Sequence, residues 1–328
     1  MFRICSTRKL PQHVQDYLTT YATLDILTKE QRESPETFVK YAADADGIIT
    51  SGMRIDDAIL SRLPKLKCVS TSSVGYDHFD TDALKKHGVY ATHTPTVLDE
   101  TVADLTFALI LATARRVVEL DTVVREGRWA GRPAEWFYGV DVHHRTLGII
   151  GMGRIGEAVA RRARLGFEMD VVYHNRSRKP EVEEKLGLEY VSFEELLAKS
   201  DFVVLLTPLT EATRGLMDDA AFQKMKSSAI FINVSRGATV NEQALFKALS
   251  EGTIRAAGLD VFVKEPTPTT NPLLSLQNVV VLPHIGSATH ATRDDMAMLA
   301  ATNLIAVLEG RLQEARIVPE LQSLIKES

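Results

Sequence analysis

Residues 147–156 read LGIIGMGRIG, and this stretch decides the fold class of the chain. The first four residues form a short apolar run typical of a buried strand, and three glycines follow in the spacing G-x-G-x-x-G. The next residues, 157–165, are rich in alanine and arginine, which favours a helix. A strand, a glycine turn and a helix in this order predict a dinucleotide site, because the glycines let the backbone approach a pyrophosphate at the helix N-terminus. Outside this context the same spacing would be an ordinary glycine-rich turn.

Short β-rich runs alternate with longer helical patterns along the chain, which predicts parallel sheets covered by helices on both faces. The runs expected in a first sheet are residues 3–5, 24–27, 47–50, 67–70 and 89–91. Those expected in a second sheet are residues 147–150, 171–173, 202–205, 230–233, 257–259 and 279–282. We therefore predict an α/β protein with two doubly wound parallel-sheet domains, a Rossmann cofactor domain and a flavodoxin-like substrate domain, with a cleft between them.

Two helical stretches set the expected domain bounds. The first begins with Thr96 and Asp99 as a capping pair. The second covers residues 289–308, and we expect it to pack on the N-terminal sheet because its apolar face needs a cover. The predicted domains are residues 98–287 for dinucleotide binding, and residues 1–97 together with 288–328 for substrate binding.

Composition narrows the class of partner. At 328 residues, with 45% hydrophobic and 25% charged residues, the chain is an ordinary globular protein with room for two domains. A net charge of -5 without long like-charge runs offers no surface for nucleic acid or an anionic membrane. Cys5 and Cys68 lie far apart without metal-ligand spacing, which fits a reducing compartment. No stretch is long and apolar enough for a membrane span or secretory signal. We expect a cytoplasmic protein with a small-molecule partner and no metal.

The end of the strand after the glycine motif selects the cofactor. An NAD site usually has an acidic residue there, about 20 residues on, to bind the adenine ribose. Residues 173–179 read YHNRSRK and contain no carboxylate. Arg176 can bind a 2′-phosphate bidentately, with Ser177 and Asn175 beside it. We therefore predict NADP(H), with NAD(H) as a less preferred cofactor; a solvated basic turn would leave the missing acid unexplained.

Three polar residues follow strands of the second predicted sheet: Arg236, Glu265 and His284. Ligands of open α/β sheets bind at that edge, so we expect the three side chains to converge. Reduction of a 2-keto acid needs a cation for the carboxylate and ketone, a hydride donor, and an acid that protonates the forming alkoxide. Arg236 and His284 fit the first and last roles, and Glu265 would orient the imidazole. Singly, each residue is more simply a surface charge, a loop residue or a helix cap.

Four ordered motifs resemble those of the D-isomer-specific 2-hydroxyacid dehydrogenases: residues 151–156, 234–237, 258–266 and 283–289. The resemblance extends from about residue 45 to residue 310. Residues 73–77, 93–97 and 141–144 are most similar to a bacterial group that reduces glyoxylate, hydroxypyruvate and 2-ketogluconate. The resemblance implies NADPH-dependent reduction of such 2-keto acids to D-2-hydroxy acids by Arg236, Glu265 and His284.

The resemblance also implies binding residues. The cofactor would contact Thr101, Gly151, Gly153, Arg154, Ile155, Gly156, Asn175, Arg176, Ser177, Thr207, Pro208, Thr213, Val234, Ser235, Asp260 and Gly286. The substrate would contact Ser51, Gly52, Met53, Val74 and Gly75 from across the cleft. In related reductases, a helix at residues 100–116 and an arm at residues 129–138 form a dimer interface. We therefore expect a homodimer, in which Trp136 either reaches the partner's active site or is an ordinary buried aromatic.

Two alternative functions stay open. Corepressors that sense dinucleotides resemble this family, although the sequence shows no long tail of the kind they use to recruit partners. A dehydrogenase on the same scaffold could also take a different substrate, such as phosphite, because the sequence does not specify the composition of the pocket.

Overall fold

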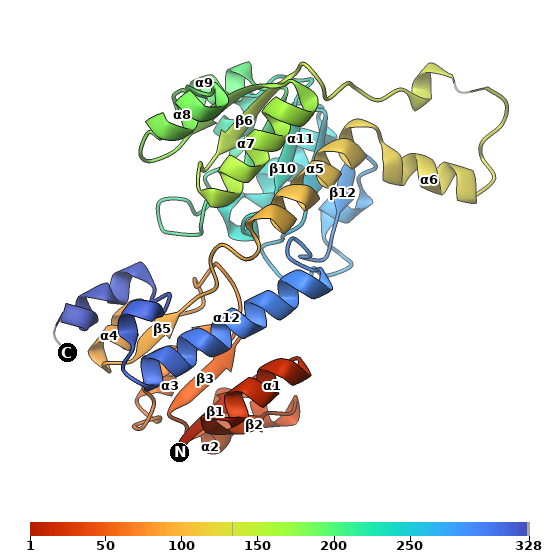
Figure 1. Ribbon diagram of the computed structural model, residues 1–328. Helices are drawn as coiled ribbons and strands as arrows, with labels where there is room; N and C mark the ends of the chain where they lie inside the picture. The colour runs from red at the N-terminus through yellow and green to blue at the C-terminus, as the bar shows by residue number, and fades with distance from the viewer. Residues whose placement is uncertain (133, 327–328) are drawn as a thin grey trace. The chain divides into compact units, whose positions relative to one another are not determined.

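The computed structural model describes residues 1–132 and 134–326, and the chain divides into two compact units (Figure 1). The first unit comprises Met1–Leu98 and Thr289–Ser328, and the second comprises Asp99–Ala288. These bounds differ by one residue from the domain bounds expected from the sequence. Pro133, within the expected arm, and residues 327 and 328, at the end of the expected substrate domain, lie outside the described residues.

The first unit is built on a parallel sheet with the strand order β2-β1-β3-β4-β5. Its strands are β1 (Phe2–Ser6), β2 (Ala22–Ile26), β3 (Gly47–Thr50), β4 (Cys68–Thr71) and β5 (Tyr90–Thr92). Its helices are α1 (Gln12–Thr19), α2 (Pro35–Ala42), α3 (Asp57–Leu60), α4 (Thr81–Lys86) and α12 (His290–Leu308). Each of the five runs predicted for this sheet is a strand, so the expected fold is confirmed here.

Helix α12 covers the first sheet, as its apolar face predicted. Its N-cap is Thr289, whose side chain accepts a hydrogen bond from the amide of Thr292. The fully buried Leu304 packs against β3, where a β-carbon added to Gly47 would lie 3.0 Å from Leu304 Cδ1. Helix α12, near the end of the chain, thus completes the core around a sheet whose strands all lie in the first hundred residues.

The second unit contains a parallel sheet with the order β12-β11-β10-β9-β6-β7-β8. Its strands are β6 (Thr146–Ile150), β7 (Asp170–His174), β8 (Glu189–Tyr190), β9 (Phe202–Leu205), β10 (Ile230–Asn233), β11 (Ala256–Leu259) and β12 (Val279–Val281). Its helices are α5 (Asp99–Ala114), α6 (Val117–Arg125), α7 (Arg154–Phe167), α8 (Pro180–Leu186), α9 (Phe193–Lys199), α10 (Asp219–Lys224) and α11 (Glu242–Ser250). The six predicted strands are present; the edge strand β8 was not expected.

The start of helix α5 corrects one prediction. The helix begins at Asp99, and Thr96 lies three residues earlier in the left-handed region with φ 80°. The hydroxyl of Thr96 donates to the carbonyl of Pro95, and Asp99 binds Arg154 of α7 instead of capping its own helix. The other end also differs, because α5 stops at Ala114 and Arg116 has a left-handed φ of 55°. The expected helix over residues 100–116 is therefore shorter.

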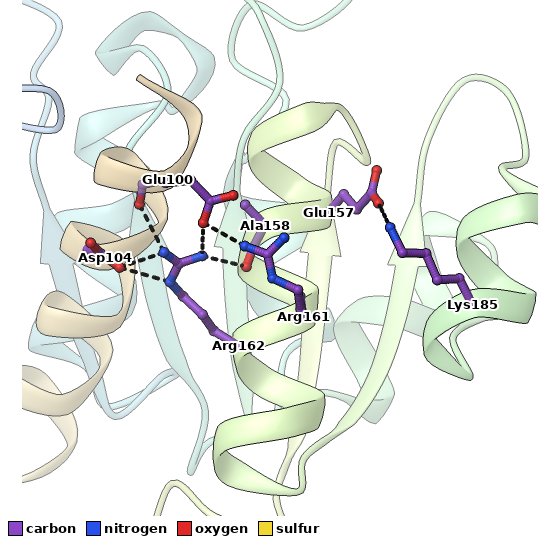
Figure 2. A network of polar contacts seen from close by, with 7 residues as sticks. All are labelled: Glu100, Asp104, Glu157, Ala158, Arg161, Arg162 and Lys185. Carbon is purple, nitrogen blue, oxygen red and sulfur yellow. Dashed lines mark hydrogen bonds and ion pairs between the residues drawn. The ribbon is translucent and has the colours of Figure 1, made fainter. Parts of the chain in front are cut away.

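Charged side chains join α5 to α7 along one exposed side of the second unit (Figure 2). Arg162 donates to Asp104, at 2.6 Å, and approaches the carboxylate of Glu100 at 2.8 Å. Arg161 reaches the same Glu100 carboxylate at 2.6 Å. These contacts fix the helix that follows the glycine motif against the helix that opens the unit.

Helix α6 and the segment after it project from the rest of the second unit (Figure 1). They carry large apolar side chains in water, including Trp129, Trp136 and Tyr138, which are 57%, 51% and 61% exposed. This segment therefore has an apolar surface that the unit itself does not cover. Across the described ranges, we find no helix with the length and apolar character needed to cross a membrane.

Candidate active site

The glycine turn between β6 and α7 has the geometry of a phosphate cradle. Gly151 has φ +106°, and a β-carbon there would lie 2.9 Å from the carbonyl carbon of Leu206. A β-carbon on Gly156 would lie 2.5 Å from the carbonyl oxygen of Gly151, so this glycine allows the helix to pack on the turn. Gly153, by contrast, borders open space. The three glycines therefore meet the separate requirements of a dinucleotide fingerprint, and the turn fits the pyrophosphate of a nicotinamide dinucleotide.

Polar groups around this turn support that fit. Nε of Arg154, at the start of α7, donates to Oδ2 of Asp99 over 3.0 Å. Burial raises the pKa of Asp99, and the charge of Arg154 partly opposes that rise. The hydroxyl of Thr207, which follows β9, is buried without a hydrogen-bond partner in the described part of the chain. A buried hydroxyl of this kind can be satisfied by a ligand that enters the cradle.

The loop after β7 contains two arginines, of which only Arg178 has an ion-pair partner among the described residues. Arg176 is exposed and has no hydrogen bond or ion pair among the described residues. Arg178 binds Glu183 of α8, with Nη2 2.6 Å from Oε2. In the same loop, Nδ2 of Asn175 donates to the carbonyl of Ser177 over 2.9 Å. Of the two arginines, Arg176 is therefore the one that can bind a 2′-phosphate without first losing a partner.

Glu265 and His284 form a hydrogen-bonded pair, with Nδ1 of the imidazole 2.7 Å from Oε2 of the carboxylate. The other oxygen, Oε1, accepts from the amide of Phe262 over 3.0 Å. Burial raises the pKa of Glu265, but the hydrogen bonds from His284 and Phe262 and the charges of His284 and Arg236 lower it further, so the net shift is downward. The three residues expected to react thus lie within electrostatic reach of one another.

The turn that carries His284 is fixed by hydrogen bonds to Asp260. His284 has a left-handed φ of 55°, a conformation that costs a residue other than glycine free energy. Both oxygens of Asp260 are occupied, because they accept from the amides of Ile285 at 2.7 Å and Gly286 at 2.8 Å. Asp260 is buried, which raises its pKa, and the two amides oppose that rise. Asp260 therefore fixes the loop that carries the imidazole.

The remaining predicted cofactor residues lie in the same unit. Ser235 is buried and donates to Oδ1 of Asn233 over 2.8 Å, and the hydroxyl of Thr213 donates to the carbonyl of Pro208 over 2.6 Å. Both hydroxyls thus already have partners within the chain. Ile155, Val234 and Gly286 lie in or directly after the motifs already described, and Thr101 lies in the first turn of α5.

The predicted substrate residues form two loops of the first unit. Ser51, Gly52 and Met53 follow β3, and Val74 and Gly75 follow the neighbouring β4. The second loop is held internally: Ser73 Oγ donates to the carbonyl of Gly75 over 2.7 Å, and Nδ1 of His93 lies 2.9 Å from the carbonyl of Val74. Both loops therefore leave the carboxyl edge of one sheet.

No cluster of three or more histidine, cysteine, aspartate or glutamate side chains suited to a metal ion occurs among the described residues. Cys5 and Cys68 are free and buried, and burial raises the pKa of each thiol.

Comparisons with known proteins identify one enzyme family. The model of the D-isomer specific 2-hydroxyacid dehydrogenase NAD binding domain matches residues 107–286. A glyoxylate/hydroxypyruvate reductase B from Escherichia fergusonii is 50% identical over 317 residues, which cover 96% of this chain and 97% of the relative.

Two crystal structures resemble the whole chain. A glyoxylate reductase from Paecilomyes thermophila is 32% identical with a TM-score of 0.88, covering 98% of this chain and 99% of that one. An NADPH-dependent glyoxylate/hydroxypyruvate reductase from Sinorhizobium meliloti, in complex with NADP and malonate, is 32% identical with a TM-score of 0.85, covering 97% of both chains. The family resemblance and the two-sheet α/β fold are thereby confirmed. The chain belongs to the D-isomer specific 2-hydroxyacid dehydrogenase family, a family of NAD(P)-dependent oxidoreductases.

Proposed function

We propose that this protein reduces small 2-keto acids, such as glyoxylate, hydroxypyruvate or 2-ketogluconate, to D-2-hydroxy acids with NADPH. The observation that carries the proposal is the Glu265–His284 pair with the charge of Arg236 beside it, in the unit that also contains the glycine fingerprint. The relative from Escherichia fergusonii carries the name of such a reductase, which supports the same substrate class.

Each residue of the set has a distinct role in this reaction. A bound reduced nicotinamide would supply the hydride. Arg236 binds the substrate carboxylate and polarises the ketone with its positive charge. Because ionised Glu265 can only accept, Nδ1 of His284 carries the proton in their hydrogen bond, and Nε2 is left to face the substrate. Nε2 then donates a proton to the forming alkoxide, and Glu265 stabilises the charged imidazolium beforehand.

The preference for NADPH rests on the loop after β7. Arg176 has no protein partner among the described residues and would bind the 2′-phosphate. The hydroxyl of Ser177 would be a second donor. No carboxylate in residues 173–179 would repel that phosphate. The structure of the Sinorhizobium meliloti relative contains NADP, which supports this choice. NAD(H) would bind without the phosphate contact and therefore less tightly.

The other cofactor and substrate residues belong to the same proposal. The backbone amides of Val74 and Gly75 and the loop at residues 51–53 would contact the substrate. This assignment is supported by the position of the two loops, which follow the adjacent parallel strands β3 and β4. Open α/β sheets bind ligands at the carboxyl ends of such strands. The hydroxyl of Thr207, which has no hydrogen-bond partner among the described residues, would bind the cofactor.

We also propose that the protein works in the cytoplasm as a homodimer. The exposed apolar side chains of α6 and the segment after it would be covered by a second copy, because several large apolar side chains exposed in one segment are typical of an interface. Trp136 would lie in that interface, and whether it reaches the partner's active site remains a prediction. The two free, buried thiols fit a reducing compartment.

A panel of keto acids assayed with NADPH and with NADH tests the proposal. We expect turnover of at least one of glyoxylate, hydroxypyruvate and 2-ketogluconate, with a higher kcat/KM for NADPH. A tenfold preference for NADH, equivalent to about 1.4 kcal/mol, would overturn the cofactor assignment. No turnover of any 2-keto acid with either cofactor would overturn the function itself.

A further inference from the structure

The loop that carries Glu265 is anchored at two points by one carboxylate outside the reacting set. Oε1 of Glu242 accepts from the amide of Val263 over 2.6 Å, and Oε2 accepts from Nδ2 of Asn271 over 3.1 Å. Val263 precedes Glu265 by two residues and Asn271 follows it by six. Glu242 therefore ties together the two ends of the segment from which Glu265 reaches His284.

Glu242 is itself fixed by its position at the start of helix α11. Glu242 is the first residue of α11, and Asn241 caps this helix by accepting from the amides of Gln243 and Ala244. The positive end of the helix dipole favours a carboxylate at this position. The start of the helix is fixed in the core by Ala244 and Leu245, which are 2% and 1% exposed. The carboxylate of Glu242 is therefore held in place by the helix.

The same stretch of backbone also lies against the turn that carries Arg236. A β-carbon on Gly237 would overlap the carbonyl carbon of Phe262 and the amide nitrogen of Val263. The amide of Phe262 in turn donates to Oε1 of Glu265. Residues 262 and 263 thus contact both the turn that carries Arg236 and the carboxylate of Glu242. A displacement of these two residues would move Glu265 relative to Arg236 and His284 together.

From these contacts we infer that Glu242 is a positioning residue for the Glu265–His284 pair. The inference rests on the proposed function, in which that pair delivers the proton. Without the Glu242 carboxylate, the amide of Val263 loses its acceptor and the loop gains freedom, so the hydrogen bond between Glu265 and His284 is formed less often. Proton delivery slows, while the glycine turn and the Arg176 loop, which bind the cofactor, keep their own contacts.

The test compares Glu242→Ala with Glu242→Gln in the full-length enzyme. The alanine variant should lose about tenfold in kcat, less than the roughly 10²–10⁴-fold that a general acid contributes, because the Glu265–His284 pair still forms part of the time. The Kd for NADPH should change less than about twofold. In the same variant, the solvent deuterium isotope effect on kcat should rise, because proton transfer limits the rate more. Glutamine keeps an oxygen for the amide of Val263 but presents a second donor to Nδ2 of Asn271, so Glu242→Gln should recover only part of the lost kcat. Glu251→Ala removes an exposed carboxylate after the same helix and should behave as wild type.

The outcomes separate this inference from the function on which it rests. Wild-type kcat and an unchanged isotope effect in Glu242→Ala would overturn the inference and leave the reductase assignment intact. An equal loss of NADPH affinity and kcat would also overturn it, because Glu242 would then support the unit in general. If the alanine variant does not fold, Asn271→Asp removes the Nδ2 donor shared by Glu242 and Thr267 and keeps the oxygen that accepts from the amide of Leu273. This variant should lower kcat with a raised isotope effect, and wild-type values would overturn the inference. Failure of the wild-type enzyme on every keto acid would overturn the function instead.

Discussion

Glu183 holds Arg178, with its carboxylate Oε2 2.6 Å from the guanidinium Nη2. Tyr173 joins the pair, since its hydroxyl donates to Glu183 Oε1 over 2.6 Å and accepts from the amide of Lys179 over 2.6 Å. Burial, together with the hydrogen bond to Glu183, raises the pKa of Tyr173 to about 12, so the phenol stays protonated. The cluster fixes the backbone of the loop after β7 and occupies one of its two arginines.

Arg176 and Arg178 should therefore respond differently to substitution. Arg176→Ala should raise the KM for NADPH at least about tenfold and leave that for NADH nearly unchanged, because only NADPH carries the phosphate. Arg178→Ala should change the NADPH to NADH preference by less than about threefold, since its guanidinium is engaged by Glu183. Steady-state kinetics with both cofactors measure the two ratios. Equal losses of preference in the two variants would contradict the assignment of Arg176.

The lowered pKa of Glu265 predicts a dependence of stability on pH. Its charge faces His284 and Arg236, so the carboxylate stabilises the fold above the ordinary glutamate pKa of 4.5, and this contribution disappears as pH falls through the lower pKa of the folded state. The difference in melting temperature between wild type and Glu265→Gln should therefore narrow as pH decreases from 7 to below 4.5. Thermal melts over that range measure it. A difference that stays constant with pH would mean that the carboxylate is not stabilised by these charges.

Arg162 and Arg161 offer a matched pair on one helix (Figure 2). Arg162 binds two carboxylates and two backbone carbonyls and is 23% exposed. Arg161 is 42% exposed, and its one partner among the described residues is Glu100. Arg162→Ala should lower the free energy of unfolding by about 1 kcal/mol, and Arg161→Ala by less than half of that. The difference should shrink at high salt, because ions screen exposed charges. Chemical denaturation at two salt concentrations tests this, and equal effects would argue against a network centred on Arg162.

Leu304 tests whether α12 completes the core of the first unit. The side chain is fully buried over Gly47, so Leu304→Ala should lower the free energy of unfolding by about 2–5 kcal/mol. Leu165→Ala, at a site 75% exposed on α7, should cost less than about 0.5 kcal/mol. Denaturant titration of the two variants gives both values. A small loss in Leu304→Ala would show that the C-terminal helix is dispensable to the sheet.

The strands could be predicted from the sequence because most of them are buried on both faces and therefore read as continuous apolar runs. Residues 202–205 and 230–233 show this clearly, since all eight are buried. Strand β8 escaped prediction because Glu189 and Tyr190 are both exposed and the strand is only two residues long. The start of α5 was misplaced because Thr96 and Asp99 have capping spacing, whereas Asp99 is bound by Arg154, 55 residues away.

The candidate site also contains residues that could be predicted from the sequence and contacts that could not. Arg236, Glu265 and His284 could be proposed because each follows a strand, and strand ends share one edge of a parallel sheet. The contacts that position these residues could not be predicted. Glu242 meets Val263 21 residues away, and Asp260 meets the amides of Ile285 and Gly286 25 and 26 residues away. Local sequence carries no signal for such contacts, which exist only once the strands are side by side.

The role of His284 as proton donor is tested most directly by single-turnover reduction of glyoxylate by the NADPH-loaded enzyme, with wild type and His284→Ala compared. Loss of the general acid should slow nicotinamide oxidation by about 10²–10⁴-fold. The Kd for NADPH should stay within about twofold, since the imidazole is paired with Glu265 and not with the cofactor cradle. A single-turnover rate within tenfold of wild type would contradict the account.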